Sequence, residues 1–225
     1  GWLLLLEPDL GAFGVICAIA VCTLWVGGFN LWVFGGLVFA LPLAFAALII
    51  SSPYRMQRVI SFMDPWSDPF GKGYQLSHAL IAFGRGEWFG VGLGASVQKL
   101  FYLPAAHTDF VFAVMGEELG LIAVLGVMAV FGVVIARAFA IARQAEAAGQ
   151  IYGARLAQGL GLLLGSQAMI NMGVNMGLLP TKGLTLPFVS YGGSSMIASC
   201  IAMGLLLLIA AAVGGTKTLL QLLER

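Results

Sequence analysis

Long uninterrupted apolar stretches are the feature of this sequence that most constrains its fold. Full-length stretches lie near residues 10–27, 31–50, 110–136, 156–178 and 196–213, and a partial one precedes Glu7. A helix needs roughly twenty apolar residues to cross bilayer hydrocarbon, which is about 30 Å thick. We therefore expect an all-α polytopic membrane protein, a single membrane domain with about five full transmembrane helices and a partial one.

The charge content agrees with a membrane protein. Of the 225 residues, 60% are hydrophobic and 9% are charged, whereas about a quarter of an ordinary soluble domain is charged. The formal net charge of +1 favours neither nucleic acid nor a strongly acidic partner. The chain opens with Gly-Trp-Leu-Leu-Leu-Leu and no basic segment, so we expect it to begin inside a membrane helix and not with a signal peptide.

The distribution of arginine predicts the face of the membrane on which each loop lies. Residues 137–155 carry Arg137, Arg143 and Arg155 against a single Glu146, and such an excess of positive charge marks cytoplasmic loops. Counting spans from there places the loop of residues 51–107 and the segment of residues 179–195 on the extracytoplasmic face. The long loop also contains basic residues, which competes with this orientation, but loops of roughly sixty residues carry little weight.

A short helix is predicted inside the long loop. Leu76, Leu80 and Phe83 recur at spacings of four and three, which places them on one face of a helix over residues 74–83. We expect this helix to lie on the membrane surface.

Asp109 is the first candidate for chemistry. It ends the long loop, follows His107 and Thr108, and precedes an apolar stretch. A carboxylate beside hydrocarbon costs free energy and is usually retained for chemistry or ion handling. The alternative is that Thr108 or Asp109 caps the helix expected to begin at Phe110. We interpret Glu117 and Glu118, two turns further on, as an acidic helix end held above the hydrocarbon.

Two other polar groups stand out. The first is the segment of residues 179–195, which we call the broken segment. It is apolar but contains prolines and glycines that forbid a continuous helix. Irregular backbone at membrane depth is tolerated only where it is buried within the protein or lines a water-filled cavity. Its Lys182 would bind an anion such as phosphate, or would be a lysine that reaches from the loop to water. Glu7 and Asp9 flank Pro8 and either pack at a helix break or face a cavity.

These motifs resemble the SEDS family, named for shape, elongation, division and sporulation. The first signature is Pro180-Thr181-Lys182-Gly183-Leu184-Thr185-Leu186-Pro187 with Ser190-Tyr191-Gly192-Gly193-Ser194-Ser195. The second is His107-Thr108-Asp109-Phe110 with Gly116-Glu117-Glu118-Leu119-Gly120. The stretches Phe83-Gly84-Arg85-Gly86-Glu87 and Ser96-Val97-Gln98-Lys99 resemble the FtsW division branch more than the RodA elongation branch. The resemblance implies ten spans, of which this chain would supply the end of the fifth and all of the sixth to tenth.

The resemblance also implies an activity. Family members are peptidoglycan glycosyltransferases that polymerise lipid II, an undecaprenyl-diphosphate-linked disaccharide peptide. They work in the bacterial inner membrane, at the septum for the division branch, with a class B penicillin-binding transpeptidase and other divisome membrane proteins. The family's essential acid falls on Asp109, whereas the acid commonly seen shortly before it is Ala105 here. With half of the family's spans absent, we expect this chain alone to be inactive.

The residues can be assigned roles in that reaction. Asp109 would be the general base for the acceptor hydroxyl. The residues that would bind the diphosphate and sugars are Lys182, Arg55, Arg58, Arg85, Lys99, Gln75, Thr185, Ser190, Ser194 and Ser195, and the supporting residues are His107, Thr108, Glu7 and Asp9. No closed metal cage is evident, so a divalent cation such as Mg²⁺ or Mn²⁺ would be held largely by diphosphate, with Asp109 as its ligand in place of a base. The alternatives are a lipid II flippase or proton-coupled transporter, and a non-catalytic divisome scaffold.

Overall fold

The computed structural model describes residues 10–28, 30–71, 73–181 and 183–223, and within these ranges it is helical with no strand. The all-α expectation is confirmed. The elements are α2 (Leu10–Val26), α3 (Leu31–Ile50), α4 (Pro53–Met63), α5 (Tyr74–Gly86), the π-helical turn η1 (Gln98–Tyr102), α6 (Val111–Ala147), α7 (Ile151–Asn175) and α8 (Gly193–Leu223). Glu7, Asp9 and Lys182 lie outside the described residues.

Three of the described helices are long and apolar enough to cross a membrane. They are α3, α6 and the Gly193–Gly214 part of α8, whereas α2 contributes a shorter apolar stretch, Ile16–Trp25. The 25 residues of α7 have a lower hydropathy because buried amides, Gln158, Asn171 and Asn175, interrupt its apolar residues. The crossing of the membrane by α2 and α7, and the ends of each span, stay predictions.

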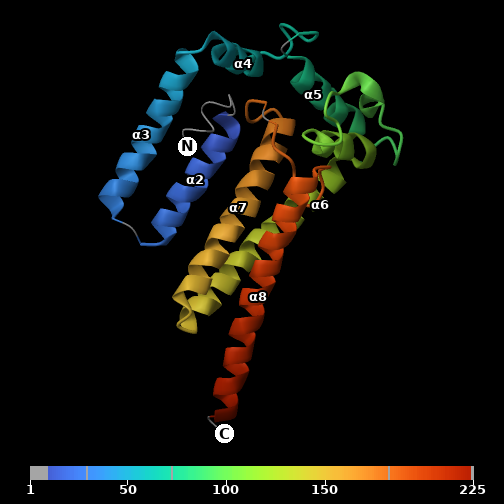
Figure 1. Cartoon of the computed structure of the whole chain (residues 1–225). Helices are drawn as coiled ribbons and strands as arrows, with labels where there is room; N and C mark the ends of the chain where they lie inside the picture. The colour runs from blue at the N-terminus through green and yellow to red at the C-terminus, as the bar shows by residue number, and fades with distance from the viewer. Residues whose placement is uncertain (1–9, 29, 72, 182, 224–225) are drawn as a thin grey trace.

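The long helices α6, α7 and α8 form a bundle, and α2 lies against α7 with α3 beyond it (Figure 1). Alanines make the seam of this bundle: Ala138, Ala142 and Ala145 of α6 face Ala154 and Ala157 of α7. Small side chains let helix backbones approach closely, which is how helices associate in lipid. None of the described residues of α3 is buried, so its apolar surface is free to face lipid.

The loop predicted at residues 137–155 is wrong in extent, because most of these residues are helical. The helix α6 continues to Ala147, and only residues 148–150 separate it from α7. Alanine is the best helix former, and three alanines past Arg137, namely Ala138, Ala142 and Ala145, are buried against α7, which keeps this stretch helical. Arg155 of α7 then comes within 3.5 Å of Glu146 of α6.

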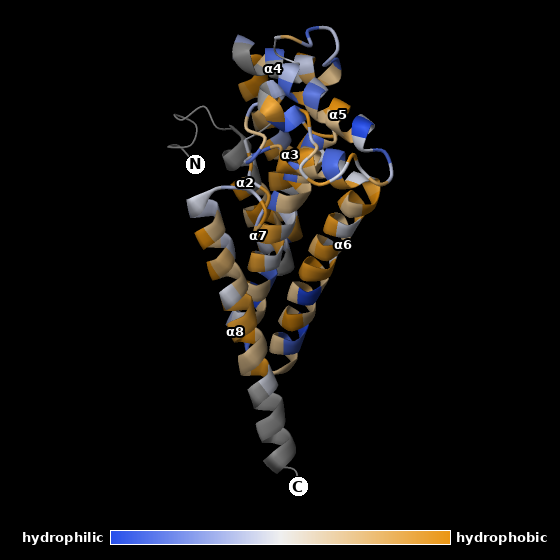
Figure 2. Ribbon diagram, turned by 90° about the vertical axis from the view of Figure 1, so that its right-hand side faces the viewer, coloured by the Kyte–Doolittle hydropathy of each residue, from blue (hydrophilic) through white to orange (hydrophobic). Residues whose placement is uncertain are grey.

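Polar residues gather at the end of the bundle where α4, α5 and η1 lie, while the shafts of α6 and α8 are apolar (Figure 2). The predicted short helix is present as α5. It buries Leu76, Ala79 and Ala82, with part of this face in the cluster that includes Phe110 and Ala113, so α5 packs on the start of α6.

A break at Gly120 divides α6 into two parts. Gly120 has φ 76° and ψ −173°, a conformation that glycine adopts because it lacks a side chain. The loop after α5 enters the break. Val91 N–H donates to Glu117 O at 2.9 Å, and Leu121 N–H donates to Glu87 O at 2.9 Å. The loop therefore satisfies backbone groups that a continuous helix would pair with each other.

Candidate functional site

Asp109 lies in a tight turn immediately before α6. The carbonyl oxygen of Ala105, which has φ 57°, accepts hydrogen bonds from the N–H groups of Thr108, Asp109 and Phe110 at 3.1 to 3.3 Å. The N-cap of α6 is Phe110, and among the described residues neither Thr108 nor Asp109 accepts an N–H of this helix through its side chain. The capping role considered for Thr108 and Asp109 is therefore wrong, which leaves the Asp109 carboxylate available for another function.

Two buried asparagines of α7 hold the backbone of Asp109. Nδ2 of Asn171 and Nδ2 of Asn175 each donate to the Asp109 carbonyl oxygen at 2.9 Å. Asn171 Nδ2 also donates to the carbonyl oxygen of Leu184 in the broken segment. Neither asparagine was predicted as a site residue, although the sequence held a signal: the polar amide of an asparagine within an apolar membrane helix usually has a hydrogen-bonding partner there.

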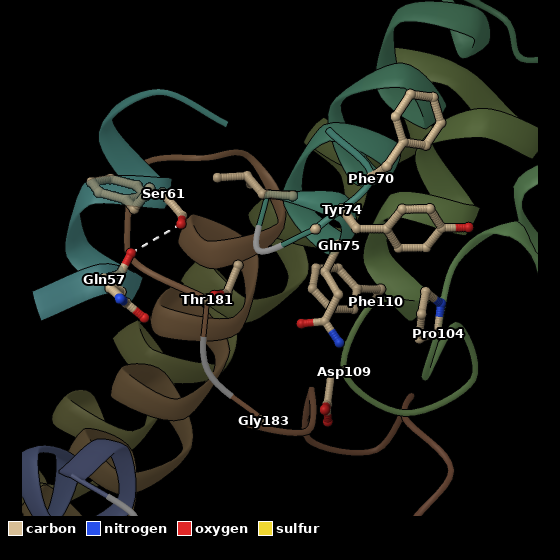
Figure 3. Close-up of a pocket in the computed structure, with 13 residues that line it drawn as sticks. Gln57, Ser61, Phe70, Tyr74, Gln75, Pro104, Asp109, Phe110, Thr181 and Gly183 are labelled. Carbon is tan, nitrogen blue, oxygen red and sulfur yellow. Dashed lines mark hydrogen bonds between the residues drawn. The ribbon is translucent and has the colours of Figure 1, made fainter. Parts of the chain in front are cut away.

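A cavity of about 640 Å³ opens beside the Asp109 side chain (Figure 3). Its lining comes from α4, the turn before α5, α5 itself, the turn before α6 and the broken segment: Gln57, Ser61, Phe62, Phe70, Gly71, Tyr74, Gln75, Leu76, Pro104, Asp109, Phe110, Thr181 and Gly183. We call it the Asp109 cavity. Its walls combine aromatic rings with amide, hydroxyl and carboxylate groups, which suits a ligand that is partly polar and partly apolar.

The broken segment comes directly against the carboxylate. A β-carbon at Gly183 would lie 3.2 Å from Asp109 Oδ2, and Thr181 lines the same cavity. The two signatures, which are separated by about sixty residues of chain, thus meet at one site. Both described neighbours of Lys182 border the Asp109 cavity, and Gln75 faces it from α5.

Burial raises the pKa of the Asp109 carboxyl above its ordinary value, because partial removal from water disfavours the charged form. The ion pairs of the described residues do not include Asp109, so no described cation offsets that effect. A carboxylate with a raised pKa accepts a proton more readily, which is the property of a general base.

Two of the cations predicted to bind diphosphate, Arg85 and Lys99, form ion pairs away from Asp109. Arg85 Nη1 lies 3.1 Å from Glu117 Oε1, and Lys99 Nζ lies 2.5 Å from Glu118 Oε1. Neither residue lines the Asp109 cavity, so their predicted role at a diphosphate stays a prediction. The side chains of Arg55 and Arg58, on α4, lie outside the described part of the structure.

Glu117 corrects the interpretation of an acidic helix end held above the hydrocarbon. Its side chain is 0% exposed. It accepts hydrogen bonds from Ser96 Oγ at 2.5 Å and from the N–H groups of Val97 and Gln98 at 3.3 Å. Together with Arg85, these donors stabilise a buried carboxylate, because a buried charge is tolerated when it is paired and hydrogen-bonded.

The hydroxyl groups predicted to bind diphosphate lie apart from the Asp109 cavity. Thr185 and Ser195 share a 2.7 Å hydrogen bond and line, with Ser194, a second cavity of about 300 Å³ between α7 and α8. Ser190 is buried, and its Oγ accepts the N–H of Leu186 at 2.8 Å. These contacts shape the broken segment, and the predicted contacts with substrate stay predictions.

His107 and Thr108 contribute through short-range contacts. The carbonyl of His107 accepts the N–H of Tyr191 at 2.9 Å, which ties the turn before Asp109 to the broken segment. Thr108 Oγ1 donates to the Ala105 carbonyl at 3.2 Å. Ala105 itself is exposed and offers no side-chain group at this position.

A resident metal site does not emerge in the part of the chain that the structure describes. No group of three or more His, Cys, Asp or Glu residues there could hold an ion. Among the described residues, Asp109 is the only acid that lines its cavity, so this donor set does not fit a metal held by side chains alone.

Comparisons with known proteins agree with this arrangement. A family model described as "Cell cycle protein" (FTSW_RODA_SPOVE) matches residues 1–214. Two proteins named "Probable peptidoglycan glycosyltransferase FtsW" are similar to the chain. The protein of Aromatoleum aromaticum is 60% identical over 207 residues, covering 92% of this chain and 50% of that protein. The protein of Thioalkalivibrio sulfidiphilus is 58% identical over 205 residues, covering 91% and 51%. The chain spans about half the length of these curated relatives.

Solved structures share the fold. One is a chain from "Structural coordination of polymerization and crosslinking by a peptidoglycan synthase complex", with a TM-score of 0.72 and 32% identity over 94% of this chain and 58% of that chain. Another is an Asp-to-Ala mutant of the Rod shape determining protein RodA of Thermus thermophilus, with a TM-score of 0.59 and 31% identity over 93% of this chain and 52% of that chain. The helical architecture, the meeting of the two signatures and the extent of the family match lead to one conclusion: the chain belongs to the FtsW/RodA/SpoVE family of cell cycle proteins.

Proposed function

We propose that the protein carrying this chain is a peptidoglycan glycosyltransferase that polymerises lipid II, with Asp109 as its general base. The observation that carries this proposal is the position of the Asp109 carboxylate, which lines the same cavity as Thr181 and Gly183 of the broken segment. The names of the similar proteins, "Probable peptidoglycan glycosyltransferase FtsW", support the same activity.

The cavity suits the two halves of lipid II. Apolar and aromatic groups such as Phe62 and Phe70 line it beside the polar groups of Gln75 and Thr181. The lining includes residues of α4 and α5, and these helices lie at the polar end of the bundle, next to the apolar shaft of α6 (Figure 2). A lipid-linked sugar can therefore keep its prenyl chain in hydrocarbon while its sugars reach the carboxylate.

Glycosyl transfer requires one proton transfer and one displacement. A carboxylate oxygen of Asp109 takes the proton of the acceptor sugar's 4-hydroxyl as that oxygen bonds to the anomeric carbon of the donor. The bond from the anomeric carbon to undecaprenyl diphosphate breaks, and its electron pair leaves with the diphosphate. Asp109 then gives its proton to water. A positioned general base contributes typically about 10²- to 10⁴-fold in rate.

Cations would stabilise the departing diphosphate. Lys182 is our first candidate, because Thr181 and Gly183 on either side of it line the Asp109 cavity. Arg55 and Arg58 are further candidates, since their helix α4 supplies Gln57 and Ser61 to the same lining. Charge-assisted hydrogen bonds to phosphate are among the strongest that proteins make.

We place this activity in the bacterial plasma membrane, in a multi-pass protein that serves the division septum. A class B penicillin-binding transpeptidase would cross-link the glycan strands. The structural match to a chain of a peptidoglycan synthase complex that coordinates polymerisation and cross-linking supports such a partner.

The decisive experiment uses full-length protein purified with its transpeptidase partner and given lipid II in detergent. Detergent removes the second compartment, so glycan chains report polymerisation and not transport. Asp109→Asn keeps the shape of the side chain but not its basicity, and we expect the polymerisation rate to fall by about 10²- to 10⁴-fold. The matched control is Asp64→Asn, an exposed acid that does not line the cavity. An Asp109→Asn protein that polymerises at the normal rate would overturn the base assignment. A parent protein that makes no polymer in detergent but moves lipid II across the membrane of sealed vesicles would favour the flippase.

A further inference from the structure

Asn171 and Asn175 form several linked hydrogen bonds, and neither residue has a role in the proposed reaction as described above. They lie one helical turn apart on α7, and both are buried. Neither lines the Asp109 cavity. Their side-chain groups point instead at backbone atoms of the two segments that do line it.

Each side-chain nitrogen donates to more than one acceptor, and Asn175 Nδ2 also lies 3.4 Å from Asn171 Oδ1. Asn171 Nδ2 bridges the carbonyl oxygens of Asp109 and Leu184, and so joins the turn before α6 to the broken segment. Asn175 Nδ2 donates to the Asp109 carbonyl and to Asn171 O, both at 2.9 Å. Asn175 Oδ1 accepts the N–H of Ala113, in the first turn of α6, at 3.1 Å. An amide provides two N–H groups and one acceptor oxygen, so these contacts use its full donor capacity.

We propose that Asn171 and Asn175 are positioning residues, which fix the Asp109 backbone against the broken segment so that the carboxylate and the residues around Lys182 face the same substrate. This inference rests on the proposed function. It adds to that function the means by which two distant parts of the chain keep the geometry that the reaction needs.

The local backbone explains why such a restraint on Asp109 is needed. Asp109 lies outside α6, in a turn whose own N–H groups all converge on one carbonyl, that of Ala105. The broken segment lacks regular hydrogen bonding where its described residues pass Asp109. Neither segment has a helix ladder to hold it, so side chains from the rigid helix α7 supply the restraint. Misplacement of a reacting group by about 1 Å can cost on the order of 10²-fold in rate.

The test separates positioning from simple stabilisation. Asn171→Asp and Asn175→Asp keep the size of the side chain but remove its N–H donors, and Asn175→Asp retains an oxygen for Ala113 N–H. Asn171→Ala and Asn175→Ala are the second set, in case a buried acid prevents folding. Gln158→Glu and Gln158→Ala are matched controls on α7, because Gln158 is also buried and its Oε1 accepts from Arg155 at 3.1 Å.

Full-length protein with its partner would be assayed for kcat and KM with lipid II, after the folded fraction has been equalised. We expect kcat to fall by about 10²-fold in the asparagine variants, with KM within about threefold and the Gln158 variants near normal. Added to Asp109→Asn, the same asparagine changes should lower the residual rate little further, because they act through Asp109.

Two results would overturn the inference. If the asparagine and Gln158 variants lose activity only in proportion to folded protein, the asparagines merely stabilise the bundle. If the asparagine changes lower the rate by the same factor in the parent protein and in the Asp109→Asn variant, they do not act through the carboxylate. Both results leave the base assignment intact. An active Asp109→Asn protein would instead overturn the base assignment and the positioning proposal together.

Discussion

Replacement of Glu117 by glutamine should strongly destabilise the end of the bundle that carries the Asp109 cavity. Three donors, Ser96 Oγ and the N–H groups of Val97 and Gln98, converge on its two carboxylate oxygens. Glutamine has the same shape, but one of its terminal atoms is itself a donor, so at least one of these groups loses its acceptor.

The size of the effect follows from burial. Removing one partner of a buried ion pair costs roughly 3–5 kcal/mol. Glu117 is 0% exposed, whereas its partner Arg85 is 42% exposed and can be solvated when the carboxylate is neutralised. We therefore expect a loss near the lower end of that range, about 3 kcal/mol in the free energy of unfolding.

The neighbouring residue supplies the control. Glu118 pairs with Lys99, and these side chains are 14% and 26% exposed, so Glu118→Gln should cost about 1 kcal/mol. Reversible unfolding of the full-length protein in mixed micelles measures both. Amide hydrogen exchange at Val97 and Gln98 should rise in Glu117→Gln but little in Glu118→Gln. Equal losses in the two variants would refute the argument from burial.

Three further predictions concern the site and the α6 break. Because burial raises the pKa of Asp109, the polymerisation rate should fall with decreasing pH at a midpoint above that of an ordinary aspartate. The folded state then binds this proton more tightly than the unfolded state does, so stability falls as pH rises from the pKa of Asp109 in the unfolded state to its pKa in the folded state. Asp109→Asn should therefore be slightly more stable than the parent at neutral pH. A drop in its unfolding midpoint would contradict this. Gly183→Ala would place a methyl group 3.2 Å from Asp109 Oδ2 and should lower kcat. Gly193→Ala, which has open space around it, should not lower kcat. Equal kcat values for the two variants would count against a close approach of Gly183 to the Asp109 carboxylate. Gly120→Ala places a side chain at a positive φ and against the backbone of residues 88–90, so it should lower the free energy of unfolding by about 1–3 kcal/mol. Its control is Gly126→Ala, which has open space on the same helix and should be neutral or slightly stabilising. Similar unfolding curves for both variants would contradict the strain at Gly120.

The sequence predicted the helical class and singled out Asp109 and the broken segment, because all of these depend on strong local signals. Apolar stretches of membrane length leave the backbone few choices other than helix. Asp109 and the broken segment were conspicuous as polar or irregular elements beside hydrocarbon. Their shared cavity follows once helices α6 and α7 pack against each other.

The features that were missed depend on contacts between distant residues. The burial of Glu117 requires the loop of residues 87–98 to fold back on α6, and no periodicity in the sequence reports such a contact. The restraint on Asp109 requires Asn171 and Asn175 to point at a carbonyl more than sixty positions away. The continuation of α6 past Arg137 depends on alanines that are buried only when α7 is in place.

The break in α6 has a consequence for the order in which the protein is built. Glu117 O and Leu121 N–H, which would bond to each other in an unbroken helix, are bonded instead to Val91 and Glu87. A bilayer offers no water to satisfy such groups. The stretch from Leu121 to Ala147 can therefore form a helix by itself, whereas the turn before it reaches its final form only when the loop of residues 87–92 has docked on it.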